Sequence, residues 1–189
     1  MKNKPNILPV GRRHEDRQAG FTLLLAALVS SIVLALGAAI FAIAQKELIL
    51  SSVGRNSQFA FYAADSAAEC ALYHDVRFSF FATSTPPDDP TPKCDGQTLK
   101  GIDGSDLNLQ RPAPSNPNPY PYTMSFQYQI SSTDLAGTLR YYCAQVSVTK
   151  SKMPSGSISS TVRADGFSTP CATITSDSQS LQRSVELRY

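Results

Sequence analysis

The chain has 189 residues, enough for one domain or for a small domain with appendages, and its formal net charge is +2. Residues 1–20 carry five basic and two acidic side chains, so the rest of the chain is nearly neutral. A nearly neutral body without a basic patch argues against a nucleic-acid-binding protein.

The first 20 residues form a charged leader, and an uncharged apolar run over residues 21–44 follows it directly. As a helix this run would be roughly 36 Å long at about 1.5 Å per residue, and about 20 apolar residues suffice to cross a bilayer core. The run therefore predicts a transmembrane helix. Because the basic residues are concentrated before it, the positive-inside rule places the N-terminus in the cytoplasm and the body outside.

Three interpretations of this segment are open. Residues 42–44 read Ala-Ile-Ala, as at a secretory cleavage site, although the apolar run is about twice the usual 7–15 residues of such a signal. The run could equally be an uncleaved anchor. The third interpretation is a signal that is cut before the run, so that the helix is kept. We favour it because residues 20–25 read Gly-Phe-Thr-Leu-Leu-Leu at the boundary between charged and apolar sequence.

One helix is predicted to continue well beyond the apolar run, because no proline occurs between Pro9 and Pro86. It would extend from about residue 21 to about residue 80, on the order of 90 Å. Beyond Gly54 the pattern is amphipathic, and the face expected to pack on a sheet recurs every three or four residues. That face consists of Phe59, Tyr62, Ala63, Ser66, Cys70, Tyr73, Val76 and Phe80.

The junction at residues 20–25, together with residues 59–71 (Phe-Ala-Phe-Tyr-Ala-Ala-Asp-Ser-Ala-Ala-Glu-Cys-Ala), resembles the type IV pilins and pseudopilins, in particular minor pilins. The resemblance covers residues 20 to about 75. It implies that a prepilin peptidase cuts between Gly20 and Phe21 and that Phe21 becomes N-methylated. It also implies packing in a filament core through the apolar side chains of Phe21, Leu23, Leu24, Leu25 and Leu28.

The chain departs from that family at Leu25, the fifth residue of the mature form, where a glutamate is usual. In the family the carboxylate is thought to neutralise the amino terminus of a neighbouring subunit, and an unpaired charge buried there costs several kcal/mol. Leucine avoids the cost but cannot offer the pairing. We therefore hypothesise a minor subunit that acts in initiation or at the filament tip, with drift in a divergent lineage as the alternative.

The C-terminal half resembles pilins in architecture only. Residues 86–121 hold nine of the 13 prolines and are predicted to be a connecting loop, not a strand region. Four runs with apolar residues at every second position follow, at residues 124–130, 142–148, 158–164 and 181–189. A turn is expected at residues 152–156, Lys-Met-Pro-Ser-Gly.

The predicted fold is therefore α+β and pilin-like, with the long helix covering one face of a four-stranded antiparallel sheet. The predicted organisation is a leader (1–20), a transmembrane and filament-core helix (21–44), an amphipathic helix half (45–85), a Pro-rich loop (86–122) and a sheet head (123–189).

All four cysteines follow the apolar run, at Cys70, Cys94, Cys143 and Cys171, and none forms a C-x-x-C pair. This spacing argues against a zinc site, and an even count in an exported region favours two disulfides over four free thiols. Of the three possible connectivities we favour Cys70–Cys94 and Cys143–Cys171. Each would stabilise the fold by about 3 kcal/mol on the loop-entropy argument.

No catalytic pattern is present, so the chain is not expected to be an enzyme or to need a cofactor or metal. His74 and Asp75 are adjacent, and adjacent residues on a helix do not face each other. There is no Gly-x-Ser-x-Gly sequence and no P-loop. Residues 103–106, Asp-Gly-Ser-Asp, faintly resemble a calcium loop but lack its later ligands, and a plain turn is the simpler interpretation.

The resemblance implies a structural function, in which the subunit waits in the cytoplasmic membrane and then enters an extracellular filament. Its partners would be other pilin subunits, the prepilin peptidase, the pilus assembly machinery and membrane lipid. A pseudopilin of a type II secretion or DNA-uptake system is one alternative. An alternative of another class is a single-pass surface protein whose head binds a ligand.

Overall fold

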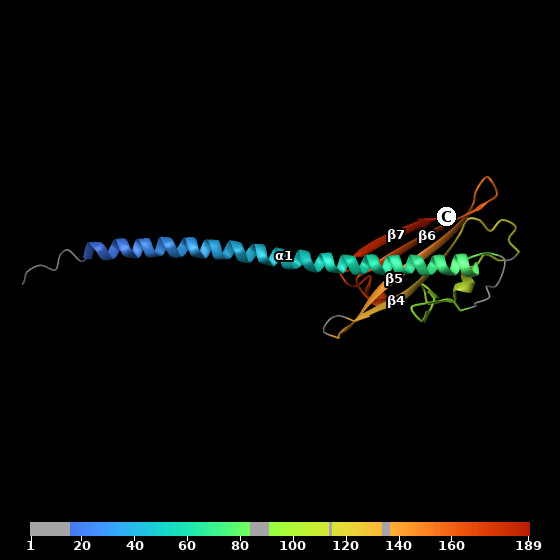
Figure 1. Cartoon of the computed structure of the whole chain (residues 1–189), viewed down its shortest axis with the longest axis horizontal. Helices are drawn as coiled ribbons and strands as arrows, with labels where there is room; N and C mark the ends of the chain where they lie inside the picture. Colours follow the sequence, from blue (N-terminus) through green and yellow to red (C-terminus); the bar gives the residue numbers. More distant parts are fainter. Residues whose placement is uncertain (1–15, 84–90, 114, 134–136) are drawn as a thin grey trace, which may run out of the picture. The chain divides into compact units, whose positions relative to one another are not determined.

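The computed structural model describes residues 16–83, 91–113, 115–133 and 137–189. The first 15 residues of the expected leader therefore lie outside the described residues. The chain divides into two compact units, Met1–Ser51 and Ser52–Tyr189. A single helix, α1 (Asp16–Phe78), contributes residues to both units (Figure 1).

The predicted long helix is confirmed, although it begins about five residues before and ends about two residues before the expected positions. It ends at Phe78 because the next residue, Ser79, has a left-handed backbone with φ of +49°. The N–H of Phe80 then donates to the carbonyl of His74 at 3.1 Å. The chain thereby turns back, and Phe80 and Phe81 become fully buried in the head.

The head contains an antiparallel sheet of order β3-β4-β5-β6-β7. The four predicted runs correspond to β4 (Tyr122–Thr133), β5 (Leu139–Lys152), β6 (Ile158–Phe167) and β7 (Gln182–Arg188). The predicted turn between β5 and β6 is confirmed, since the N–H of Met153 donates to the carbonyl of Ser157 and Gly156 has φ of +87°.

The expectation of four strands was wrong, because the sheet has five. The fifth, β3 (Lys100–Gly101), pairs with β4 and comes from the segment that was predicted to be a loop without strands. The same segment forms β1 (Lys93–Cys94), β2 (Gln97–Thr98) and the 3-10 helix η1 (Leu107–Gln110). The reason is local: residues 93–111 contain no proline, so their N–H groups can donate, while two-residue strands are too short to show an alternating pattern.

The predicted packing face of the helix was also wrong at four of its eight positions. Tyr62, Ser66, Tyr73 and Val76 are exposed, although Ala63 and Phe80 of that set are buried. The face that covers the sheet is instead a row of alanines, at Ala60, Ala63, Ala64, Ala67, Ala68 and Ala71. Small side chains let the helix backbone approach the sheet closely, so its larger side chains point outward.

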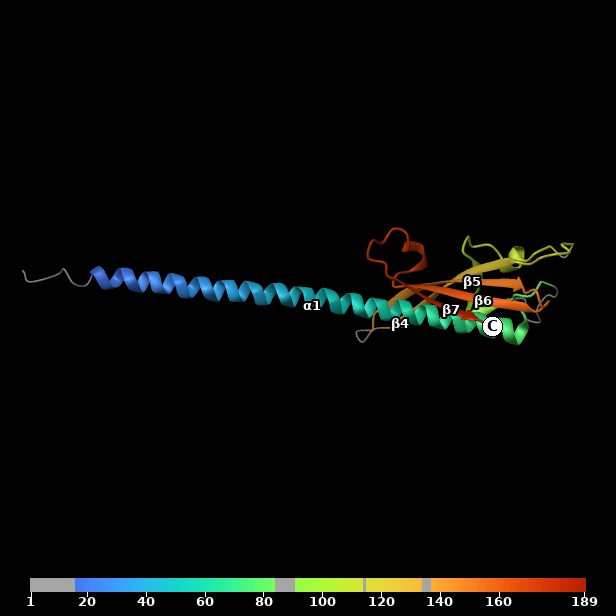
Figure 2. The ribbon, with the colours of Figure 1, turned by 90° about the horizontal axis from the view of Figure 1, so that it is seen from above.

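The core of the head lies between these alanines and the inner face of the sheet, along which α1 runs (Figure 2). Inward side chains at alternating positions of the strands fill it, together with aromatic rings from the segment after the helix. The largest fully buried side chains are Phe80, Phe81, Leu107, Met124, Phe126, Val146, Val148 and Val162.

Candidate functional site

The first unit presents a long apolar helical surface. The side chains expected to pack in a filament, at Phe21, Leu23, Leu24, Leu25 and Leu28, are between 53% and 73% exposed. An 18-residue window of the helix reaches a mean hydropathy of 2.6, so this helix is long and apolar enough to cross a membrane. The hydroxyls of Ser30 and Ser31 donate to the carbonyls of Ala26 and Leu28, which satisfies these polar groups inside an apolar surface.

The junction between Gly20 and Phe21 lies within α1, and both residues are exposed. A Cβ atom built on Gly20 would meet nothing within 4 Å. Among the described residues of the first unit, none therefore covers this junction.

Both favoured disulfides are present in the head. Cys70–Cys94 joins α1 to β1, and Cys143–Cys171 joins β5 to the 3-10 helix η2 (Cys171–Thr173). The sulfurs of Cys70 and Cys94 lie within 4.8 Å of a ring nitrogen of His74, a grouping that could otherwise hold a metal ion. With both sulfurs joined to each other, neither is a thiolate ligand.

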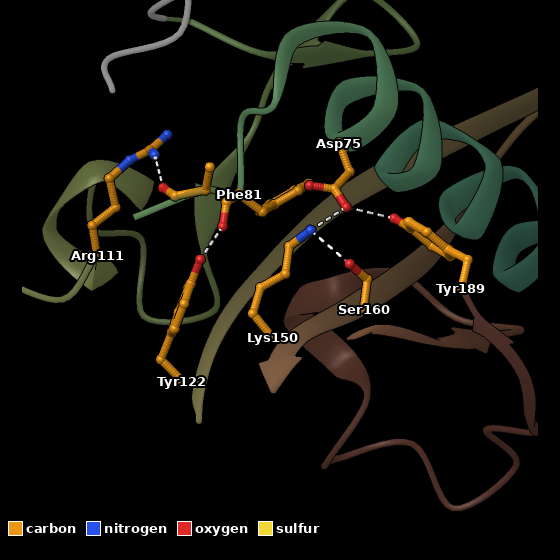
Figure 3. A network of polar contacts seen from close by, with 8 residues as sticks. Asp75, Phe81, Arg111, Tyr122, Lys150, Ser160 and Tyr189 are labelled. Carbon is orange, nitrogen blue, oxygen red and sulfur yellow. Dashed lines mark hydrogen bonds and ion pairs between the residues drawn. The ribbon is translucent and has the colours of Figure 1, made fainter. Parts of the chain in front are cut away.

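A buried polar network joins the end of the helix to the sheet (Figure 3). Lys150 of β5 pairs with Asp75 of α1, and the two side chains are only 10% and 4% exposed. The Lys150 ammonium also donates to Ser160 Oγ at 2.7 Å, and the Tyr189 hydroxyl donates to Asp75 Oδ2 at 2.6 Å. Four side chains from three elements and the last residue of the chain thus meet at one point.

The sequence contains one signal for this network, which did not enter the predictions. In β5, Val146, Val148 and Lys150 occupy alternating positions on the inner face, so the pattern already places a lysine where an apolar residue is expected. A buried lysine requires a partner. That partner, Asp75, lies 75 residues earlier in the chain, a distance that local patterns do not bridge. His74 and Asp75, as expected, do not act together, because His74 Nε2 contacts the Lys93 carbonyl at 3.0 Å.

Two further polar contacts hold the segment that follows the helix. The Tyr122 hydroxyl donates to the carbonyl of Phe81, and the Arg111 guanidinium donates to the carbonyl of Ala82 at 2.7 Å (Figure 3). Burial raises the pKa of Tyr122 to about 12. Burial likewise raises the pKa of Tyr189, and its hydrogen bond to Asp75 adds to the effect, so this phenol remains a donor at neutral pH.

The head contains a cleft of about 890 Å³. It is lined by the part of α1 around Arg55, the end of β4, the start of β5 and the segment after β6. Its floor contains the stacked rings of Phe59 and Tyr142, whose centroids are 4.8 Å apart. Arg55, Arg140 and Asp177 are among its charged lining residues. The sequence did not indicate this cleft, because Arg55 and Arg140 are far apart in the chain.

The loop that faintly resembles a calcium site is a turn held by its own side chains. Asp103 Oδ1 accepts hydrogen bonds from the N–H of Ser105 at 3.0 Å and from its hydroxyl at 2.6 Å. These bonds to Ser105 lower the pKa of Asp103. The carboxylate that would lead a set of calcium ligands is thus already engaged within its loop.

No family model, no curated protein and no solved structure matches this chain.

Proposed function

We propose that this chain is a minor subunit of the type IV pilin class, which is inserted in the cytoplasmic membrane and then incorporated into a surface filament. One observation carries the proposal. The helix α1 contains the uncharged apolar run that starts directly after Gly20, and its later part supplies the alanine face that covers the sheet of the disulfide-linked head. An anchor and a structural core are thus parts of one continuous element.

The apolar run is suited to lateral association in an environment without water. Helices in lipid associate through van der Waals packing and shape, since lipid tails are as apolar as leucine. Leu25 keeps this surface free of charge, and the subunit therefore cannot offer a carboxylate to the amino terminus of a neighbour. We assign such a subunit to the initiation complex or the tip, where one of its sides has no further subunit to accommodate.

The experiment that tests the proposal is the mass of the intact mature protein, isolated from membranes and from sheared surface filaments. We expect a chain that starts at Phe21 and carries one added methyl group. Gly20→Lys should leave the leader attached, whereas Gly37→Ala, a matched change inside the run where a Cβ meets nothing within 4 Å, should not.

Other masses would support other functions. A start at Gln45 would mean a secreted head and would end the filament proposal. An unprocessed chain in cells with an active prepilin peptidase would indicate a single-pass surface protein. That second candidate has one observation in its favour, the cleft with its aromatic floor and two arginines, which could hold an acidic ligand. A processed chain that is found in the envelope but not in surface filaments would favour a pseudopilin.

A further inference from the structure

The contact between Lys150 and Asp75 brings an amine and a carboxyl group together in a nearly dry site. Lys150 Nζ is hydrogen-bonded to Asp75 Oδ2, and the carboxyl carbon Cγ lies one bond beyond that oxygen. The two side chains come from β5 and from the last turn of α1, and both are held by elements that pack in the core (Figure 3). This is the only buried ion pair among the ion pairs of the described residues.

Several polar contacts hold the two side chains of this pair in place. In the part of the chain that the structure describes, Asp75 accepts both of its side-chain hydrogen bonds on Oδ2, from Lys150 and Tyr189, and none on Oδ1. The Lys150 ammonium has three N–H groups, and its acceptors are Asp75 and Ser160. Its remaining neighbour is the Tyr189 ring, whose centroid is 5.9 Å away, the outer limit for a cation–π contact.

An amide in the same place would satisfy every one of its groups. Its single N–H would donate to Ser160 Oγ, and its carbonyl oxygen would accept from the Tyr189 hydroxyl. Both partners already stand at hydrogen-bond distance, 2.7 Å from Nζ and 2.6 Å from Oδ2 respectively. The amide would also remove two buried charges, and the desolvation of buried charges is costly even when they are paired.

We propose that Lys150 and Asp75 form an intramolecular amide bond, which joins Nζ to Cγ with the release of one water molecule. Once the carboxyl group has rotated so that Oδ1 faces the amine, the ammonium gives a proton to Oδ1, which yields a neutral amine and a neutral acid. The amine lone pair then attacks Cγ, a second N–H proton goes to Oδ1, and the C–Oδ1 bond breaks as water leaves. The third proton stays on the amide nitrogen, so atoms and charge balance without any other reactant.

The site supplies what this step requires. Fixed proximity acts as an effective concentration of about 10⁵–10⁸ M in well-oriented intramolecular reactions. The Tyr189 hydroxyl donates to Oδ2, the oxygen on which negative charge develops during attack. Attack on Cγ requires rotation about the last torsion of Asp75, which is broad for a carboxyl group.

The bond would tie the end of the helix to the centre of the sheet, since β5 has strands on both sides. The two linked residues are 75 positions apart, and the disulfides span 24 and 28 positions. Under a pulling force, the helix could then not separate from the sheet through unfolding alone, because the amide bond would also have to break. The inference does not depend on the proposed function, because it concerns the chemistry of the folded head in any setting.

The test is the intact mass of the folded wild-type chain, followed by fragmentation of its tryptic peptides. We expect a mass that is lower by one water molecule than the mass of the sequence with both disulfides formed, and one branched peptide in which Lys150 is joined to Asp75. A full mass, with both residues in separate unmodified peptides, would overturn the proposal, and so would a missing water that maps elsewhere.

Variants identify the reacting groups. Lys150→Arg should restore the full mass, and Asp75→Asn should form the same amide with loss of ammonia in place of water. Lys152→Arg is the matched control, because it changes an exposed lysine at the end of the same strand and should keep the missing water.

Tyr189→Phe should slow formation of the bond about 100-fold if the hydroxyl polarises the carboxyl group. The rate of bond formation is measured on pulse-labelled chains in which both disulfides have already formed, so that slow bond formation is not confused with slow folding.

Discussion

At Gly166, on strand β6, the backbone of helix α1 comes closer than any side chain would permit. A Cβ atom there would lie 2.0 Å from the carbonyl oxygen of Ala60 and 2.5 Å from the backbone N of Ala64. Both contacts are with backbone atoms, which cannot move aside as the end of a flexible side chain can. Glycine is therefore required at this position because there is no room for a side chain, and not because of an unusual φ.

Gly166→Ala should consequently destabilise the head by about 3 kcal/mol, the upper part of the range for overpacked cores, or displace the helix. The measurement is the midpoint of chemical unfolding, followed by the circular dichroism of the head. Gly54→Ala is the matched control, because it introduces the same methyl group where nothing lies within 4 Å. It should stabilise the helix by about 0.5–1 kcal/mol. Equal effects of the two substitutions would contradict the close approach of the helix.

Because of Tyr122, the stability of the head should decrease at alkaline pH. Its pKa is raised from the usual 10.0 to about 12 in the folded state, so the folded chain holds a proton that the unfolded chain loses first. The stabilisation is therefore complete below pH 10 and is lost as the pH rises towards 12. Unfolding midpoints measured across this window should fall, and Tyr122→Phe should reduce the slope. Tyr62→Phe, the same substitution at an exposed position of the head, is the matched control.

At the scale of elements, α1 has two faces with opposite roles in the head. Its alanines permit close packing on the sheet, while Tyr62, Tyr73 and Val76 remain outside. Hydrophobic periodicity alone favours the face with the larger side chains, which is why the prediction was wrong at these exposed positions. The close approach that excludes large side chains is a property of the helix and sheet together, and Gly166 is its counterpart on the sheet.

Ala64→Leu should therefore cost about 1–3 kcal/mol in unfolding free energy, because the added carbons have no space between helix and sheet. Glu69→Leu, which places the same side chain on an exposed position of the same helix, should change stability by less than about 0.5 kcal/mol. Thermal unfolding of both variants in parallel gives the comparison. A larger loss for Glu69→Leu would mean that the outer face of the helix is covered in the isolated protein.

At the scale of the whole molecule, the two units need different solvents. The first exposes an apolar helical surface, with Leu23 and Leu34 each 73% exposed, and the second has a buried core with two disulfides. A surface as apolar as the first is stable in lipid or against other apolar helices, but not in water.

A chain that begins at Ser52 should accordingly be soluble, with both disulfides formed and with the same unfolding midpoint as the head of the full chain. In a detergent phase-separation experiment the full chain should enter the detergent phase and the shortened chain the aqueous phase. If the shortened chain aggregates or forms other disulfides, residues before Ser52 contribute to the fold of the head.

Local sequence patterns were sufficient to predict the elements that depend on near neighbours in the chain. The apolar run, the proline-free helix, the four alternating strands and the turn at Met153–Gly156 follow from periodicity and turn chemistry between near neighbours. The favoured disulfide pairs are also present in the structure. Three features became visible only in the folded chain: which helix face is buried, that β3 joins the sheet, and that Lys150 contacts Asp75. These features depend on contacts between residues far apart in the chain, whose geometry is set when the helix closes on the sheet.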